Sequence, residues 1–105
     1  MNIKESAEKL GLEEDEYLEL IELFMDTGMV DIEKLSSAIE KGDTEEATQA
    51  AHSLKGASGS LGLMEIHNLA LKSEEEARNN SLDGIAESVQ KLRAQLNSLA
   101  EVARK

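Results

Sequence analysis

One histidine and one lysine are the residues best suited to chemistry in the stretch from Ala51 to Gly62, which reads AHSLKGASGSLG. The sequence predicts a helix here, because apolar residues recur at steps of three and four: Ala47, Ala50, Leu54, Ala57 and Leu61. His52 lies two residues before Leu54, which turns it roughly 160° away from that stripe. We therefore expect its imidazole to face solvent.

Other residues share the side of His52 at steps of three, four and seven: Thr48, Gln49, Lys55, Gly56 and Gly59. Lys55 is the only Lys or Arg between Lys41 and Lys72. A glycine inside a helix lowers its stability by about 1 kcal/mol relative to Ala, so the presence of Gly56 and Gly59 requires an explanation. We expect them to clear space for another protein beside the imidazole; the alternative is close packing of a neighbouring helix.

An exposed histidine on a helix is most often an ordinary surface residue, but the chemistry of its ring suits phosphoryl transfer. An ordinary imidazole has a pKa of about 6.5, so it is largely neutral at pH 7 and one ring nitrogen can attack phosphorus without a strong base. The product is anionic. Lys55, three residues after His52, could partly neutralise it.

The run H-x-L-K-G-x-S-x-x-L-G resembles the signature of histidine-containing phosphotransfer (HPt) domains. Its residues here are His52, Leu54, Lys55, Gly56, Ser58, Leu61 and Gly62. The resemblance extends to the Ala-rich lead-in after Gly42-Asp43 and to the following helix with Ile66 and Leu69. It implies that His52 accepts a phosphoryl group from an aspartyl phosphate on one receiver domain and passes it to the Asp of another. The resemblance also implies that Mg²⁺ belongs to the receiver, so the chain needs no cofactor of its own.

The resemblance implies two further residues on the next helix. HPt domains often place a Gln there that hydrogen-bonds the imidazole, sometimes followed one turn later by a basic residue. Those positions hold Glu74 and Arg78. Glu74 departs from the family's amide, since it could accept the ring N–H but would repel a phosphate. His67 lies outside the motif and is expected to be solvated or at the edge of the bundle, and no metal site is expected, because two histidines without organised carboxylates cannot fill a coordination sphere.

Length and composition indicate one all-α domain covering residues 1–105. The core must be aliphatic, because Tyr17 and Phe24 are the only aromatic residues, and there is no Pro. The periodicity predicts five helices: residues 3–10, 13–41, 44–60, 64–79, and a last helix capped by Ser81 or Asp83 that reaches Ala103. Short connections favour an antiparallel up-down four-helix bundle with a short extra N-terminal helix at one end.

The expected core faces follow the same periodicity. In the long second helix they are Tyr17, Ile21, Phe24, Gly28, Ile32, Leu35 and Ile39, with Gly28 expected to bend or break the helix. The first half carries further apolar residues, either buried among several helices or forming an exposed patch for a partner: Leu18, Leu20, Leu23, Met25 and Met29. Gly42 should end this helix, and Asp43 with Glu46 should form a capping box. The later helices should bury Leu63, Ile66, Ala70, Ser73 and Ala77, then Ile85, Val89, Leu92, Leu96, Leu99 and Ala103.

Charge excludes several functions. The net charge of −11 argues against nucleic acid and anionic membranes as partners. The chain has no Cys, no apolar N-terminal run typical of a signal peptide, and no segment long enough to span a membrane, so we expect a cytoplasmic monomer. Without a Gly-rich phosphate loop or an ATP-binding motif, it should be a carrier rather than a kinase.

Three alternatives remain open. An acyl carrier protein is also small, acidic and helical, but it needs Asp-Ser-Leu where this chain has His52-Ser53-Leu54. A non-catalytic helical adaptor would dock a partner through the first half of the long helix and would be indifferent to His52. The chain could also be the HPt domain of a larger chemotaxis-type or hybrid sensor kinase, with the same chemistry in cis. The expected partners are thus receiver domains, a hybrid kinase, or both.

Overall fold

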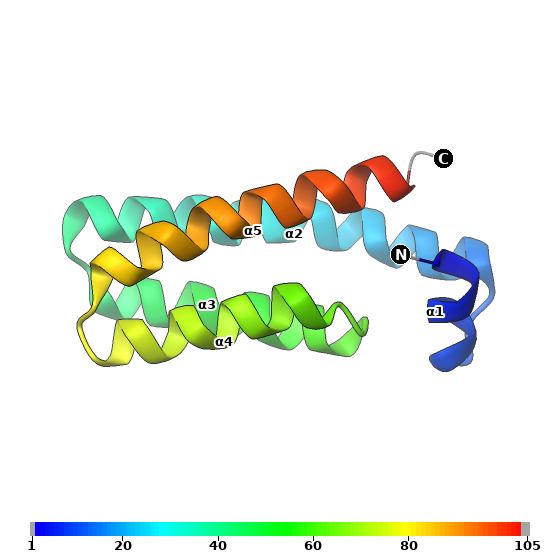
Figure 1. Cartoon of the computed structure of the whole chain (residues 1–105), viewed down its shortest axis with the longest axis horizontal. Helices are drawn as coiled ribbons and strands as arrows, with labels where there is room; N and C mark the ends of the chain where they lie inside the picture. Colours follow the sequence, from blue (N-terminus) through cyan, green and yellow to red (C-terminus); the bar gives the residue numbers. More distant parts are fainter. Residues whose placement is uncertain (1, 104–105) are drawn as a thin grey trace.

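The computed structural model describes residues 2–103, and within them it is all helical, as predicted. The helices are α1 (Ile3–Lys9), α2 (Glu14–Lys41), α3 (Thr44–Ser60), α4 (Met64–Arg78) and α5 (Leu82–Ala103). The four long helices lie lengthwise beside one another, and consecutive ones run in opposite directions (Figure 1). α1 packs on α2 and lies beyond the turn that joins α3 to α4.

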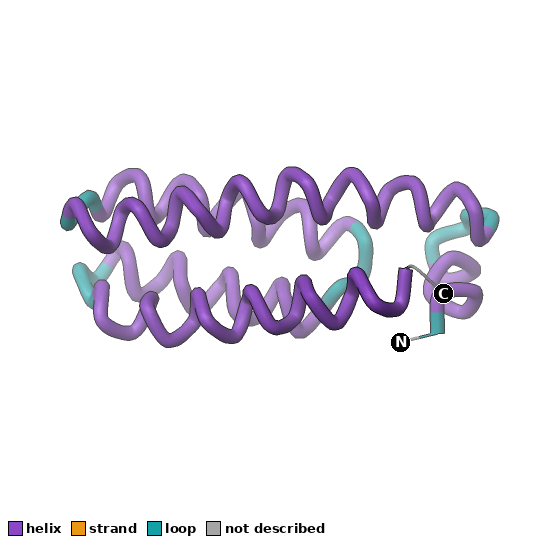
Figure 2. The backbone as a smooth tube through the Cα atoms, turned by 90° about the horizontal axis from the view of Figure 1, so that it is seen from above, coloured by secondary structure: helices purple, strands orange, loops and turns teal. Residues whose placement is uncertain are grey.

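Each long helix packs against two others: α2 contacts α3 and α5, and α4 contacts the same two helices. Short connections join the helices at their ends (Figure 2). The centre of this arrangement is mostly aliphatic, with Tyr17 and Phe24 as its aromatic members. Its largest fully buried apolar side chains are Tyr17, Ile21, Ile32, Leu35, Leu54, Ile85 and Leu92. None of the helices in residues 2–103 combines the length and the apolar character needed to cross a membrane.

Local signals fix the helix ends. Gly42 ends α2 with a φ of 68°, a left-handed conformation that glycine adopts without strain, and Asp43 Oδ1 accepts the backbone N–H of Glu46 at 3.0 Å. Both were predicted. Glu46, however, turns its carboxylate to within 3.8 Å of Lys41 Nζ, and the return bond of the capping box is not formed. The reciprocal box occurs instead at the start of α2, between Glu13 and Glu16.

Some expected boundaries were wrong by one residue. α1 ends at Lys9, and Leu10 is 41% exposed, so Leu10 does not extend the buried face that Ala7 provides. α4 ends at Arg78. α5 begins at Leu82, which places Asp83 inside the helix and rules it out as the N-cap.

The buried face of α2 follows the predicted stripe, except that Ala38 is buried at the last position and Ile39 only partly. The helix is continuous through Gly28, so of the two outcomes expected there, a bend or a break, the break does not occur. A Cβ at Gly28 would lie 3.4 Å from Leu96 and 3.5 Å from Leu54. A methyl group at Gly28 would therefore make ordinary van der Waals contacts with side chains of both neighbouring helices.

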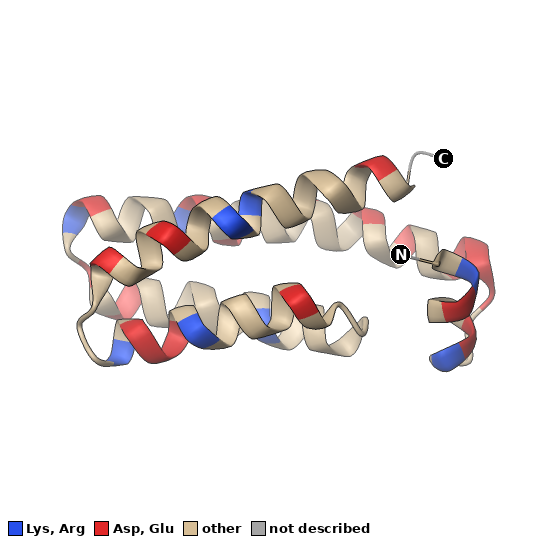
Figure 3. Cartoon of the chain, in the orientation of Figure 1, with Lys and Arg blue, Asp and Glu red and all other residues tan. Residues whose placement is uncertain are grey.

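The extra apolar residues in the first half of α2 are not all buried. Leu20, Leu23 and Met29 are exposed, and so is Val30, so burial among several helices does not explain them. Met25, by contrast, is partly buried against the core. The same half of α2 carries acidic residues, and the sequence holds no Lys or Arg between Lys9 and Lys34 (Figure 3).

The predicted faces of α4 and α5 are confirmed, with Ser73 buried among the apolar residues and Ala103 partly buried. Ser73 fits there because its hydroxyl donates to the Leu69 carbonyl at 2.9 Å, which satisfies it within its own helix.

Candidate functional site

The rotation of α3 places His52 outward, with its side chain 67% exposed. The buried residues of the helix are Ala47, Ala50, Ala51, Leu54 and Ser58. Ala57 is exposed and Leu61 only partly buried, so the predicted stripe was wrong at its C-terminal end. Ser58 takes the buried place that Ala57 was expected to hold, because its hydroxyl donates to the Leu54 carbonyl at 2.7 Å.

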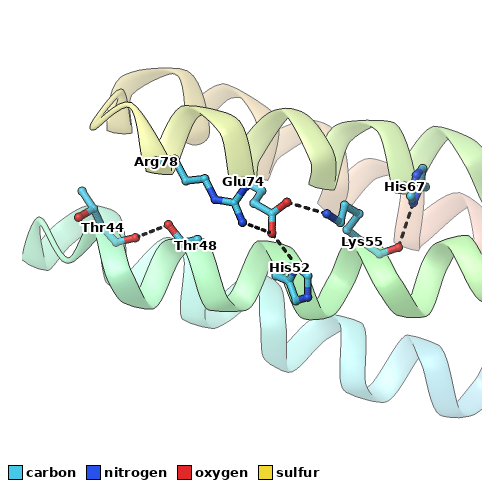
Figure 4. A network of polar contacts seen from close by, with 7 residues as sticks. All are labelled: Thr44, Thr48, His52, Lys55, His67, Glu74 and Arg78. Atoms are coloured by element: carbon cyan, nitrogen blue, oxygen red, sulfur yellow. Dashed lines mark hydrogen bonds and ion pairs between the residues drawn. The ribbon is translucent and has the colours of Figure 1, made fainter.

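Glu74 is the centre of the site. It projects from α4 toward α3 and is 2% exposed (Figure 4). Its Oε2 lies 2.7 Å from His52 Nδ1, and its Oε1 accepts a hydrogen bond from Lys55 Nζ at 2.7 Å. Arg78 Nη2 lies 3.5 Å from the same Oε2. The fold thus brings His52 and Lys55 of α3 together with Glu74 and Arg78 of α4.

The Glu74 carboxyl is held in its ionised form. The hydrogen bond from Lys55 is the largest cause that lowers its pKa; burial acts in the opposite direction, and the His52 hydrogen bond and the Arg78 charge lower the pKa further. An ionised carboxylate can only accept, so its contact with His52 requires the proton to be on Nδ1. In the neutral form of this ring, Nε2 then carries the free lone pair.

Lys55 is less free than the sequence suggested. Its side chain is 24% exposed and its ammonium is bonded to Glu74. Arg78, at 62% exposure and a longer distance from the carboxylate, is the more accessible cation of the pair.

The two glycines of α3 have different surroundings. A Cβ built at Gly56 would meet nothing within 4 Å, so this side of the helix is open beside His52. A Cβ at Gly59 would lie 3.0 Å from His67 Nδ1. Gly59 therefore makes room for the imidazole of α4, which is the close packing of a neighbouring helix that the sequence left open as the alternative, and its contact with a partner protein stays a prediction.

His67 has a role that the sequence reasoning missed. It is partly buried between α4 and α3, and its Nδ1 lies 3.0 Å from the Lys55 carbonyl, which can only accept (Figure 4). This hydrogen bond ties α4 to the backbone of the helix that carries His52. The sequence feature that could have indicated this role is Gly59, because the absence of a side chain there leaves the space that the His67 ring occupies.

The remaining expected contact residues lie on the same side of α3 as His52. Thr48 is partly buried and donates its hydroxyl to the Thr44 carbonyl at 2.8 Å, whereas Gln49 is exposed. Gln49 lines a polar cleft of about 290 Å³ between α2 and α3 together with Asp31 and Ser53. Ser53 Oγ donates to Asp31 Oδ2 at 2.9 Å, and burial raises the pKa of the Asp31 carboxyl.

No group of three or more metal-ligating side chains gathers within residues 2–103.

Comparison with known proteins identifies the family. The family model for the Hpt domain matches residues 19–102, which include α3, α4, most of α2 and nearly all of α5. Comparisons with curated proteins and with solved structures return no significant match. Hpt domains are helical phosphocarrier modules of two-component signalling that interact with receiver domains. The match covers most of the chain and includes the whole His52 site, so this chain belongs to the Hpt domain family.

Proposed function

We propose that residues 1–105 form one domain, an antiparallel up-down four-helix bundle of α2–α5 with α1 added, that acts as a phosphorelay intermediate. His52 accepts a phosphoryl group from an aspartyl phosphate on one receiver and passes it to the Asp of another. One observation carries this proposal: an exposed imidazole whose Nδ1 meets a buried, ionised carboxylate at 2.7 Å, leaving Nε2 free.

The chemistry follows from that tautomer. Nε2 attacks phosphorus, the N–P bond forms as the O–P bond of the acyl phosphate breaks, and the electron pair of that bond goes to the receiver's carboxylate. Nδ1 keeps its proton, so the phosphorylated ring is cationic and Glu74 balances its charge. A cationic ring is the better leaving group when the second receiver takes the phosphoryl group. Mg²⁺ belongs to the receivers in this scheme.

Glu74 acts as a positioning residue. It contacts Nδ1, across the ring from the nitrogen that reacts, and Lys55 and Arg78 offset its negative charge. We propose that Lys55 and Arg78 also stabilise the phosphoryl group, Lys55 by leaving its bond to Glu74 and Arg78 from its exposed position.

The partner surface that we propose around His52 includes Thr48, Gln49 and Gly56. The open side of Gly56 lets a receiver approach the ring, because no side chain occupies that space. The proposal includes a monomer acting in the cytoplasm, either free-standing or as one domain of a larger sensor kinase, and no kinase activity of its own.

Transfer from a panel of phosphorylated receiver domains tests this function. The expected product is acid-labile, alkali-stable phosphate on the parent protein and none on His52→Gln, with both proteins equally helical by circular dichroism. Labelling that survives His52→Gln would overturn the assignment. A helical adaptor would bind a partner but acquire no phosphate, and an acyl carrier protein would carry a pantetheine adduct detectable by mass spectrometry.

A further inference from the structure

Two residues of α4 contact Lys55, one at each end of that residue. His67 Nδ1 lies 3.0 Å from the Lys55 carbonyl, and Glu74 Oε1 accepts a hydrogen bond from the Lys55 ammonium at 2.7 Å (Figure 4). His67 and Glu74 are seven residues apart, so they lie on the same face of α4, about 10 Å apart along the helix axis. α4 is therefore joined to α3 at two points along this face.

The bond from His67 differs from the other polar contacts of the site. A carbonyl can only accept, so the proton of this bond is on Nδ1 of His67. The acceptor belongs to the backbone of α3 and cannot move unless the helix moves. The Lys55 and Arg78 side chains, by contrast, are long and flexible, so their cations can follow the Glu74 carboxylate if it moves. The His67 bond therefore constrains α4 in a way that the two ion pairs do not.

Apolar packing alone determines the rotation of α4 weakly. Its buried face has one large apolar side chain, Ile66. The other buried residues, apart from Glu74, are small: Ala70, Ser73 and Ala77. Small side chains form shallow ridges that interlock little, and a buried polar contact can then select one arrangement. Because a hydrogen bond weakens beyond roughly 3.2 Å, a small rotation of α4 would take Glu74 away from the ring of His52.

Gly59 allows the His67 ring to reach α3. A Cβ at Gly59 would lie 3.0 Å from His67 Nδ1 and 3.3 Å from Cε1, which is closer than ordinary contact. The bare backbone therefore lets the ring come near enough to bond the Lys55 carbonyl. A glycine lowers the stability of α3, and this one stands where the ring enters.

We propose that His67 is a positioning residue for the reaction at His52. Its hydrogen bond to the Lys55 carbonyl fixes the rotation of α4, and that rotation keeps Glu74 in contact with Nδ1 of the reacting ring. His67 acts through Glu74 and does not touch the phosphoryl group. This inference rests on the proposed function, since it names a residue that prepares the same site.

Nitrogen NMR of the unphosphorylated protein tests the link from His67 to the His52 ring. The spectra are recorded at about pH 8.5, where an ordinary imidazole is neutral. The chain has two histidines, so a variant at His67 leaves the ring signals of His52 alone. His67→Phe keeps a ring beside Gly59 but removes the donor, and it should turn the single Nδ1–H tautomer of His52 into a mixture. His67→Asn places an amide N–H where the Nδ1–H was and should keep the parent tautomer. Asn68→Ala, at an exposed residue of α4, is the control.

Gly59→Ala gives a second route to the same measurement. Its Cβ would press on the His67 ring while the imidazole is kept, so the minor tautomer of His52 should again gain population. This variant decides the question if His67→Phe does not fold.

Transfer from a receiver tests the consequence for the reaction. With the receiver at saturation, His67→Phe should transfer about fivefold more slowly, the loss expected once the ionised carboxylate no longer holds the ring. Receiver affinity should stay within twofold of the parent, because His67 is partly buried.

Three results would overturn the proposal: a single His52 tautomer in His67→Phe, a mixture as large in His67→Asn, or the parent transfer rate in His67→Phe. A panel in which no receiver phosphorylates His52 would instead overturn the proposed function. The tautomer measurement needs no receiver, so it would still show whether His67 positions Glu74.

Discussion

At the scale of single residues, Glu74 sets the state of the histidine. A glutamine at this position could either donate or accept, so it would leave the ring tautomer undetermined, whereas an ionised carboxylate fixes the proton on Nδ1. Nε2 is then free in the resting protein, before any partner arrives.

Replacement of Glu74 by Gln should slow transfer in both directions. A hydrogen bond to a charged group is stronger than a neutral one by about 1 kcal/mol, so we expect a rate lower by about fivefold. Rapid-quench measurement of transfer to and from a receiver checks this, and nitrogen NMR should show the Nδ1–H tautomer of His52 in the parent and a mixture in the variant. A variant that keeps both the parent rate and a single tautomer would show that the carboxylate is dispensable.

Replacement of Lys55 by Ala should reduce the yield of phosphorylated protein. The substitution removes the largest cause that lowers the pKa of Glu74 and one cation near the phosphoryl group. We expect a loss of roughly tenfold or less in transfer rate, since one partly exposed charge contributes about 1 kcal/mol or less. Intact-protein mass spectrometry measures the phosphorylated fraction, with Lys72→Ala as an exposed-lysine control. Receiver binding that weakens as much as transfer would make Lys55 a docking residue instead.

At the scale of elements, the two glycines of α3 should respond differently to the same change. Gly56→Ala should stabilise the protein by about 0.5–1 kcal/mol, because alanine is the better helix former and its Cβ enters open space. Gly59→Ala should be less stable than Gly56→Ala, because its Cβ would push on the His67 ring. Urea denaturation measures both. Equal stability of the two variants would contradict the packing role assigned to His67.

The helices were predictable because their signals are local. Gly42 and Asp43 end one helix and start the next through bonds within a few residues, and the core stripes follow from periodicity. The failures had two physical sources. Ser58 replaced Ala57 in the core because its hydroxyl is satisfied by its own helix, and Gly59 serves a histidine that lies on another helix.

The sequence could predict which residues lie near one another at the site, but not which hydrogen bonds they form. Helical spacing placed Lys55 one turn from His52, and the family resemblance pointed to Glu74 and Arg78. The spacing on α3 could not show that the Lys55 ammonium would be bonded to Glu74, because that depends on how α4 is rotated against α3.

At the scale of the whole molecule, the contacts of Glu74 with His52, Lys55 and Arg78 should make the free energy of unfolding depend on pH. The pKa of Glu74 is lowered by folding, so its contribution is complete above its ordinary value of 4.5 and is lost as pH falls through the folded value. The difference in free energy of unfolding between the parent and Glu74→Gln should therefore be constant near neutral pH and shrink below about pH 4.5. Urea denaturation from pH 7 to pH 3 checks this. A difference that grows on acidification would mean that the folded pKa is raised.

The most direct test of the central claim is to find which atom carries the phosphoryl group. A receiver aspartyl phosphate is used to phosphorylate the protein labelled with ¹⁵N in its histidines, and the ring nitrogens are observed by NMR before and after transfer. We predict phosphorus bonded to Nε2 of His52, a proton retained on Nδ1, and no phosphate on His67. Phosphate on Nδ1 of His52, on His67 or on a residue other than histidine would contradict the account.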